Sequence, residues 1–246
     1  MLNRTFLKQQ IKQHIPTKVL WPILRWRRQP VTPANWLNLR QLTPMSRSFG
    51  FDRGTPICRH YIAQFLSYHA QDIHGCVLEI ADANYTNQFG GKRVVKSDVL
   101  HVTGDNPNAT IVGNLATGEG IPHNAFDCII LTQTLPFIYD LRAAVRHLHA
   151  ALRPGGVVLA TASGISPISR YDMERWGDFW RLTDASAKKL FEESFLPEHI
   201  QVTTYGNVLS AVAYLHGLAA EELTWTELDA CDPDYQVIIA IRAEKS

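Results

Sequence analysis

The feature that most constrains the fold is a series of seven short apolar runs spread along the chain. They occupy residues 77–80, 93–99, 109–114, 126–131, 156–161, 199–205 and 235–243, and helical patterns lie between most of them. Strands that alternate with helices form a largely parallel sheet with right-handed crossovers. The sequence therefore predicts an α/β fold with a seven-stranded, mostly parallel sheet, helices on both faces and a hairpin-like last pair of strands at one edge.

Two of the helical patterns have clear ends. The first has Thr55 as its cap and Pro56 in its first turn, and its apolar face runs to about His69. The second begins after Asp140 and is predicted to end at Pro154-Gly155-Gly156. Ligands of such sheets bind beyond the carboxyl ends of the strands, so we expect the functional residues in the loops at that edge.

Charge is distributed unevenly along the chain. Residues 1–51 carry nine Lys or Arg and no acid, whereas the rest carries 15 basic and 23 acidic residues. We expect residues 1–50 to form a basic N-terminal arm and residues 51–246 to form one domain, because 246 residues with 46% hydrophobic composition suffice for a large core. The apolar, aromatic and basic composition of the arm fits an interfacial membrane anchor or an arm packed on the domain, and both interpretations remain open.

The remaining composition bounds the class of protein. No apolar run reaches the roughly 18 residues that span a membrane, and the N-terminus lacks a secretory signal pattern. The four cysteines are far apart and fit no metal-ligand spacing. We predict a cytoplasmic protein with no metal site and no nucleic-acid partner; the arm leaves open a peripheral place at the inner face of the membrane, or an enzyme partner.

The loop after the first predicted strand departs from the pattern of nucleotide-binding folds. Such folds place glycines where the backbone approaches the ligand, but here the turn reads Ala81-Asp82-Ala83-Asn84. Alanine at positions 81 and 83 keeps the loop slim, and Asp82 and Asn84 tolerate the unusual dihedrals that glycine would otherwise supply. The stretch therefore favours a working variant of a cofactor loop over the remains of one.

Four features in the right order carry a family resemblance. They are Glu79 in the first strand, Asp98 19 positions later, the phrase FDCIILTQTLPFIYD and the phrase LHAALRPGGVVLAT. Together they resemble the class I S-adenosylmethionine-dependent methyltransferases, from about Gly54 to the end of the chain. The resemblance implies a Rossmann-like domain whose cofactor is S-adenosylmethionine.

The resemblance also implies cofactor-binding residues: Glu79, Ala81, Ala83, Asp98, Asn114, Thr132 and Gln133. A carboxylate at the end of the second strand, expected at Asp98, would accept both ribose hydroxyls. Asn114 corresponds to the position that contacts the adenine amino group. Thr132 and Gln133 fall where the methionine portion and the acceptor meet. A loop aspartate, a turn asparagine and a polar helix start are the structural alternatives for these positions.

The acceptor is expected to contact the long loop from Gly164 to Thr183, which holds four aromatic residues among charges. Its phrase WGDFWRLT is similar to segments of methyltransferases of bacterial surface-glycan pathways. Pro136 and Phe137 replace the paired histidines of ubiquinone-type methyltransferases, so the base must come from elsewhere. We name Asp172 as the base, because it is a carboxylate placed among aromatic residues, and Tyr171 as its catalytic neighbour. A structural flap, with Asp172 as a cap, is the alternative.

The function expected from these features is S-adenosylmethionine-dependent methyl transfer to a hydroxyl of a glycan or a related small metabolite. We expect cofactor contacts mainly from the first three strands, so changes in the 164–183 loop should spare cofactor binding. A pseudo-methyltransferase scaffold that does not turn over cofactor is one alternative. A nicotinamide-dependent oxidoreductase is the other, disfavoured because no G-x-G-x-x-G follows the first strand.

Overall fold

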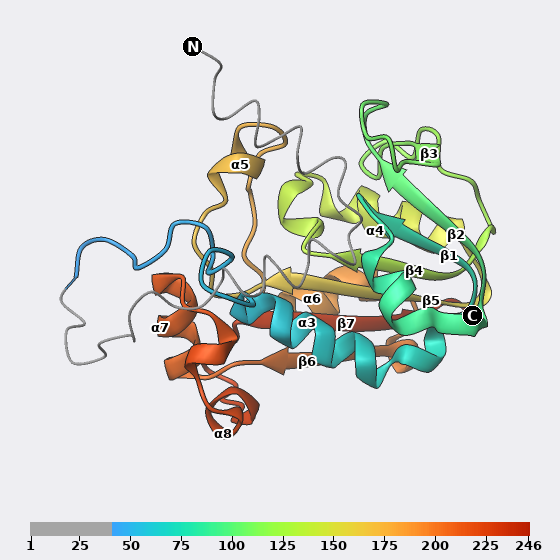
Figure 1. Cartoon of the computed structure of the whole chain (residues 1–246). Coiled ribbons are helices and arrows are strands. Elements are labelled where there is room, and N and C mark those ends of the chain that lie inside the picture. Colours follow the sequence, from blue (N-terminus) through green and yellow to red (C-terminus); the bar gives the residue numbers. More distant parts are fainter. Residues whose placement is uncertain (1–40) are drawn as a thin grey trace, which may run out of the picture.

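The computed structural model describes residues 41–246, and the expectations about residues 1–40 lie outside this range. Its centre is one seven-stranded sheet with the order β3-β2-β1-β4-β5-β7-β6 (Figure 1). The strands are β1 (Gly75–Ile80), β2 (Val94–His101), β3 (Ile111–Val112), β4 (Phe126–Thr132), β5 (Leu152–Ser163), β6 (Ile200–Tyr205) and β7 (Ile238–Glu244). All pair in parallel except β7, which is antiparallel to β5 and β6. The predicted seven-stranded, mostly parallel sheet is confirmed.

Two strand predictions differ from the structure in detail. The third run was expected to span residues 109–114, but only Ile111 and Val112 pair with β2. The backbone then turns, because the N–H of Gly118 donates to the carbonyl of Asn114 at 2.7 Å. The last two strands are antiparallel neighbours, as expected, but residues 206–237 separate them and hold two helices.

The helices are α3 (Ile57–Tyr68), α4 (Leu141–Ala151), α5 (Arg170–Met173), α6 (Asp184–Glu192), α7 (Val208–His216) and α8 (Trp225–Asp229). Asp140 caps α4 as predicted, since its carboxylate accepts from the N–H of Ala143 at 2.9 Å. The Pro154-Gly155-Gly156 segment does not end this helix but lies within β5, which starts directly after Ala151. None of the helices in residues 41–246 is long and apolar enough to span a bilayer.

The cap predicted for α3 is wrong. The N-cap position is Pro56 and no side chain caps the helix there. The Thr55 hydroxyl instead donates to a carboxylate oxygen of Glu221 at 2.7 Å. A contact with a distant segment has therefore replaced the local capping bond.

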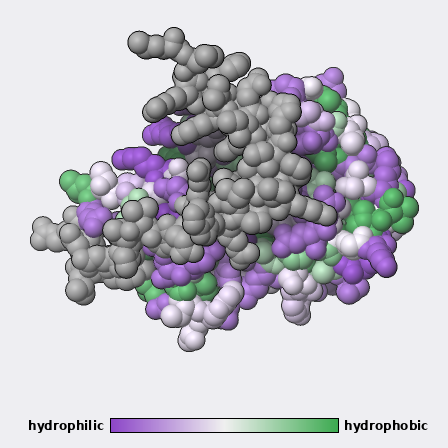
Figure 2. All heavy atoms as spheres, viewed as in Figure 1, coloured by the Kyte–Doolittle hydropathy of each residue, from purple (hydrophilic) through white to green (hydrophobic). Residues whose placement is uncertain are grey.

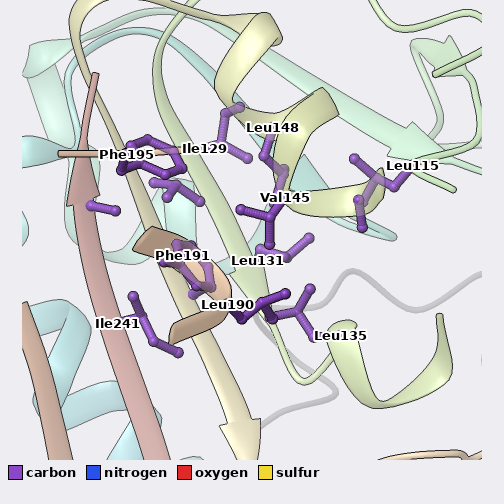
Figure 3. Close-up of a cluster of buried hydrophobic side chains, with 14 of the residues drawn as sticks. Leu115, Ile129, Leu131, Leu135, Val145, Leu148, Leu190, Phe191, Phe195 and Ile241 are labelled. Carbon is purple, nitrogen blue, oxygen red and sulfur yellow. The ribbon is translucent and has the colours of Figure 1, made fainter. Parts of the chain in front are cut away.

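The two faces of the sheet bury separate sets of side chains, because neighbouring residues of a strand point to opposite faces. On one face, Ile129 and Leu131 of β4 meet α4 and α6 (Figure 3). On the other, Cys128 and Ile130 of the same strand meet α3. Helices on both faces are thus confirmed. On the outside, hydrophilic and hydrophobic residues are interspersed over the visible face (Figure 2).

A strap of residues 45–56 precedes α3 and packs on the segment after α7. The N–H of Ser46 donates to the carbonyl of His216 at 3.0 Å, and Pro56 forms an isolated bridge with Ala219. The buried carboxylate of Glu222 pairs with Arg53 at 2.6 Å. The strap begins before the boundary that we predicted between residues 50 and 51, and that division stays a prediction.

We predict that Gly217→Ala destabilises the protein by about 2–3 kcal/mol, because it combines two penalties. Gly217 has φ +71, and a Cβ there would lie 2.3 Å from the carbonyl oxygen of Ser46, so the strap would have to move. Gly155 is the matched control: its φ is +77 but nothing lies within 4 Å of the added Cβ, so Gly155→Ala should cost only about 1 kcal/mol. Urea unfolding measures both values, and equal losses would mean that the strap is not fixed at Gly217.

Candidate functional site

The candidate site lies where the order of the strands reverses. From β1 the chain proceeds outward to β2 and β3, and then returns to β4 on the other side of β1. A crevice outside the carboxyl ends of β1 and β4 is the usual ligand position in such a sheet. Ala81 follows β1 directly and Gln133 follows β4 directly, so both residues lie at this expected ligand position, which is called the crevice below.

Both flanking residues have left-handed backbones. Ala81 has φ +71 and Gln133 has φ +52, a region that costs a residue with a Cβ about 1–2 kcal/mol. Within residues 41–246 only Phe49 and Asn124 share this feature among the non-glycine residues. Such strain persists where the surroundings enforce it, and it clusters at functional sites.

The loop after β1 carries its strain at an unexpected position. Asp82 and Asn84 were the residues that tolerate unusual dihedrals, but the left-handed backbone lies at Ala81 instead. Asp82 uses its carboxylate to accept from the N–H of Asn84 at 2.9 Å. The carbonyl of Ala81 accepts from the side-chain amide of Asn106 at 2.7 Å, and the carbonyl of Ala83 accepts from a backbone N–H. Alanine thus occupies a conformation that glycine would adopt without strain.

Glu79 organises this loop from within β1. Its side chain is buried and accepts three hydrogen bonds, from the N–H of Tyr85 at 3.1 Å and from the N–H and hydroxyl of Thr86 at 2.7 and 2.8 Å. Burial raises the pKa of the carboxyl to about 7 in spite of these bonds. All three contacts are made within the loop, so the geometry assigns Glu79 a structural part in shaping it. Its contact with a cofactor stays a prediction.

Arg59 is a candidate that the sequence reasoning missed. It lies on α3, and its guanidinium donates to the hydroxyl of Tyr85 at 2.9 Å, beside the loop after β1. Within residues 41–246 no carboxylate lies within ion-pair distance of it, whereas five other arginines of this range form ion pairs with an acid. A partly buried cation without a carboxylate partner suits an anionic ligand group. An arginine in an amphipathic helix resembles a solvent-facing residue, so no local sequence pattern pointed to Arg59.

Asp98 does not lie where the ribose-binding carboxylate was expected. β2 continues for three residues beyond it and ends at His101. The Asp98 side chain is buried within the strand, where it pairs with Lys96 at 2.8 Å and accepts from the Thr110 hydroxyl at 2.9 Å. The expected position at the end of β2 is therefore wrong, because the strand extends further than its apolar pattern indicated. His101 occupies that end.

Asn114 follows β3 after one residue and forms a turn. Its side-chain oxygen accepts from the N–H of Ala116 at 2.8 Å, while its backbone carbonyl accepts from Gly118. The turn interpretation, left open above, describes this local structure. Whether Asn114 contacts an adenine ring stays a prediction.

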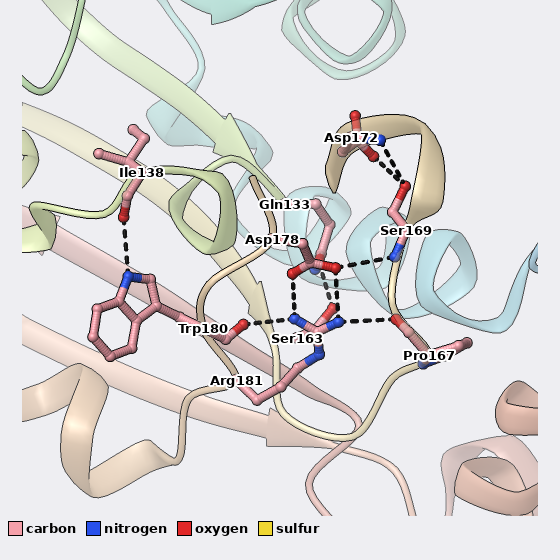
Figure 4. Close-up of polar contacts among 9 residues, drawn as sticks. All are labelled: Gln133, Ile138, Ser163, Pro167, Ser169, Asp172, Asp178, Trp180 and Arg181. Carbon is pink, nitrogen blue, oxygen red and sulfur yellow. Dashed lines mark hydrogen bonds and ion pairs between the residues drawn. The ribbon is translucent and has the colours of Figure 1, made fainter. Parts of the chain in front are cut away.

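Gln133 is tied to β5 and has a buried, unpaired amide nitrogen. Its N–H donates to the carbonyl of Thr161 at 2.9 Å, and its side-chain oxygen accepts from the hydroxyl of Ser163 at 2.6 Å (Figure 4). Its Nε2 is buried and has no partner among the described residues. A buried donor without an acceptor costs about 1–3 kcal/mol, which a ligand oxygen would recover. Thr132 ends β4, and its carbonyl accepts from the Thr134 hydroxyl.

The loop of residues 164–183 has a firmly held base. Asp178, whose side chain is 1% exposed, pairs with Arg181 at 2.6 Å and accepts from the N–H of Ser169 (Figure 4). The indole of Trp180 donates to the carbonyl of Ile138 at 3.1 Å, and the N–H of Phe179 donates to a carbonyl in the same segment after β4. The base of the loop is therefore fixed against the residues that follow β4.

The predicted catalytic pair lies at the tip of this loop, on α5. Tyr171 is 65% exposed, and the guanidinium of Arg175 lies 3.5 Å from its ring centroid. The Asp172 carboxylate accepts from the Ser169 hydroxyl at 2.5 Å, and Ser169 caps α5 in return. The cap of α5 is therefore Ser169, and Asp172, which was expected as a cap in the alternative interpretation, lies within the helix and binds the capping hydroxyl. A catalytic role for either residue stays a prediction.

A groove lies apart from the crevice. An open groove of about 490 Å³ runs along the β3 edge, lined by Thr110, Ile111, Val112, Gly120, Ile121 and Pro122. It borders the outer strand of the sheet, so we do not assign it to the site between β1 and β4. In the described part of the chain no three His, Cys, Asp or Glu side chains are grouped to hold a metal ion.

We predict that Ala81→Gly stabilises the protein by about 0.5 kcal/mol. Glycine removes roughly 1–2 kcal/mol of left-handed strain, less about 0.4–1 kcal/mol for the greater freedom of the unfolded chain. Ala83 lacks a positive φ, so Ala83→Gly is the control and should destabilise by about 0.5–1 kcal/mol. Urea unfolding of the two variants tests this, and a loss of stability in Ala81→Gly would contradict it.

A pH dependence follows from Glu79. Because its pKa is raised from 4.5 to about 7, the folded protein holds this proton more tightly than the unfolded chain. The resulting stabilisation is complete below about pH 4.5 and is lost as the pH rises through 7. The unfolding free energy of the wild type minus that of Glu79→Gln should fall by up to roughly 3 kcal/mol from pH 4.5 to pH 8. A difference that does not vary with pH would refute this assignment.

Comparisons with known proteins agree with this geometry. A family model described as a methyltransferase domain matches residues 36–205. A SAM-dependent methyltransferase from Archaeoglobus fulgidus has a similar structure, with a TM-score of 0.51 and 10% identity over 78% of this chain and 96% of that one. The [4+2]-cyclase SpnF has a TM-score of 0.51 and 14% identity over 92% and 93%. At these identities the structures show the fold alone.

No curated protein matches the chain by sequence. The family match covers most of the chain and includes β1 to β6, and thus both sides of the crevice. It decides against the nicotinamide-dependent oxidoreductase. The chain belongs to the methyltransferase domain family and is a class I methyltransferase that uses S-adenosylmethionine.

Proposed function

We propose that this enzyme transfers the methyl group of S-adenosylmethionine to a hydroxyl of a glycan or a related small metabolite. The observation that carries the proposal is the unpaired, buried amide of Gln133 at the end of β4, opposite the strained Ala81 at the end of β1. The cofactor supplies an electrophilic methyl group on a sulfonium. The residues around the crevice position that group and the acceptor.

The crevice residues suit the cofactor by size and charge. The alanines at 81 and 83 leave the backbone of the loop open to close approach, as glycines would. Arg59 lies beside this loop and would pair with the carboxylate of the methionine portion. The Nε2 of Gln133 would donate to an oxygen of the cofactor or acceptor. Thr132 and Asn114, at the ends of the neighbouring strands, are the further contacts that we propose.

The loop after β5 suits a polar, ring-shaped acceptor. Tyr171, Trp176 and Phe179 expose 65%, 38% and 46% of their surface, and flat aromatic faces beside charged groups are typical of pockets for such ligands. The similarity of WGDFWRLT to glycan-pathway methyltransferases supports the same class. We propose Asp172 as the base that accepts the hydroxyl proton, with Tyr171 beside it. Most of the rate would come from holding the hydroxyl oxygen in line with the methyl group, with water excluded.

We also propose that the basic arm of residues 1–50 binds an anionic surface, either the headgroup layer at the inner face of the membrane or an acidic enzyme partner. This would place the protein in the cytoplasm, at that surface. Nine basic residues without an acid in residues 1–51 support the proposal. Membrane binding is tested by sedimentation of the protein with anionic vesicles, which should decrease as the salt concentration rises. If the protein binds neither the vesicles nor an acidic protein partner, the proposal for the arm is wrong.

Cofactor binding is tested by calorimetry with S-adenosylhomocysteine. We predict at least micromolar affinity for the wild type, and a loss of about 1.5–3 kcal/mol in Arg59→Met, the range for a hydrogen bond to a charged group. Arg142, which is exposed on α4 and pairs with Glu193, is the control, and Arg142→Met should bind as the wild type does. No heat with the wild type at millimolar ligand would favour the pseudo-methyltransferase scaffold.

Acceptor chemistry is tested by mass shift with candidate glycans. Asp172→Asn keeps an oxygen that can accept from Ser169, so it removes the charge and not the cap. We predict that this variant and Tyr171→Phe lower methyl transfer tenfold or more, which is about 1.4 kcal/mol in the barrier. If both variants transfer methyl groups at the wild-type rate, Asp172 and Tyr171 have no catalytic role.

A further inference from the structure

The 164–183 loop crosses the crevice, as its contact with the end of β2 shows. The ring of Trp176 lies against the ring of His101, with 5.9 Å between centroids and an angle of 83° between the planes. The loop leaves the sheet at the end of β5, and β4 and β1 separate β5 from β2. Three strand spacings of about 4.8 Å make a span of roughly 14 Å. The loop must therefore pass over the ends of β4 and β1.

His101 stands at the level of the cofactor loop. In the parallel register Ile80 of β1 is opposite Leu100 of β2, so Ala81 and His101 are the next residues on the two strands. The Nδ1 of His101 lies 3.2 Å from the backbone nitrogen of Thr103, a contact that fixes the ring. The imidazole thus stands at the end of β2, which Asp98 does not reach.

The loop is held at its base and rests on His101 at its tip. Asp178, Arg181 and the backbone of Phe179 fix the base beside β4 and β5. Trp176, two residues before Asp178, is 38% exposed, so the residue is partly covered and keeps surface that a ligand could contact. An edge-to-face pair of aromatic rings adds roughly 0.5–1.5 kcal/mol to the burial of their surfaces.

We infer that Trp176 and His101 form the wall that closes the cofactor pocket over the ribose and adenine of S-adenosylmethionine. The inference rests on the proposed function and goes beyond it, because it makes the acceptor loop a cofactor-binding element. His101, and not Asp98, is the residue of β2 that faces the ribose. The contact argues against the separation of cofactor and acceptor contacts that we expected from the sequence.

A consequence of the shared loop is coupling between the two ligands. A cofactor that packs beneath Trp176 holds the tip that carries Tyr171 and Asp172. The acceptor then meets a loop that has already been ordered. Each ligand therefore raises the affinity of the other, and by the same factor.

The test compares S-adenosylhomocysteine affinities in a double-mutant cycle. We expect Trp176→Ala and His101→Ala each to weaken binding at least fivefold, and the double variant to lose less than the product of the two losses. Trp176→Phe, which keeps an aromatic ring, should stay within about twofold. Trp225→Ala is the control, since Trp225 is 72% exposed on α8 and lies outside the loop, and it should bind as the wild type does.

Hydrogen exchange supplies a second measurement. Amides of residues 168–177 should exchange more slowly when S-adenosylhomocysteine is added to the wild type, and this protection should be lost in Trp176→Ala. Wild-type affinity and protection in Trp176→Ala would overturn the inference and leave the proposed function intact. If the wild type itself binds no S-adenosylhomocysteine, the proposed function and the inference fall together.

Discussion

The parallel pairing of β1 with β4 is the contact on which the rest of the molecule depends. Val77, Leu78 and Glu79 lie opposite Cys128, Ile129 and Ile130, in the middle of the sheet. These two strands are not consecutive in the chain, so their pairing brings Ala81 and Gln133 to the same edge. Both faces of the pair are covered by helices, which leaves the carboxyl ends as the place where a ligand can approach.

That edge brings several energetically costly features close together. It holds two left-handed residues, a buried carboxyl with a raised pKa and an amide nitrogen without a partner. Elsewhere in the described residues, buried charges are compensated directly, as in the pairs Asp178–Arg181 and Glu222–Arg53. Rules of local structure are commonly broken at functional sites, where a ligand completes what the chain leaves unsatisfied.

The sequence was informative where one physical signal dominates. Apolar runs located the central strands because a parallel strand is buried on both faces, and Asp140 marked the start of α4 because its capping bond is local. The sequence was less informative where contacts with distant segments determine the local structure. Thr55 bonds to Glu221 and not to its own helix. β2 extends beyond its apolar pattern, so Asp98 lies within the strand and not at its end. The partners of Arg59 and Trp176 lie 26 and 75 positions away, so no short pattern contains them.

The position of β7 between β5 and β6 sets an order of assembly during synthesis. Within residues 41–246, β6 pairs with β7 alone, and residues 206–237 must be made after β6 before β7 can follow. Until then β5 presents one unpaired edge and β6 presents two. A chain in which β6 has formed and β7 has not yet been inserted therefore has a half-built sheet that offers open hydrogen-bonding edges to other chains, and the insertion of β7 closes both gaps in a single step.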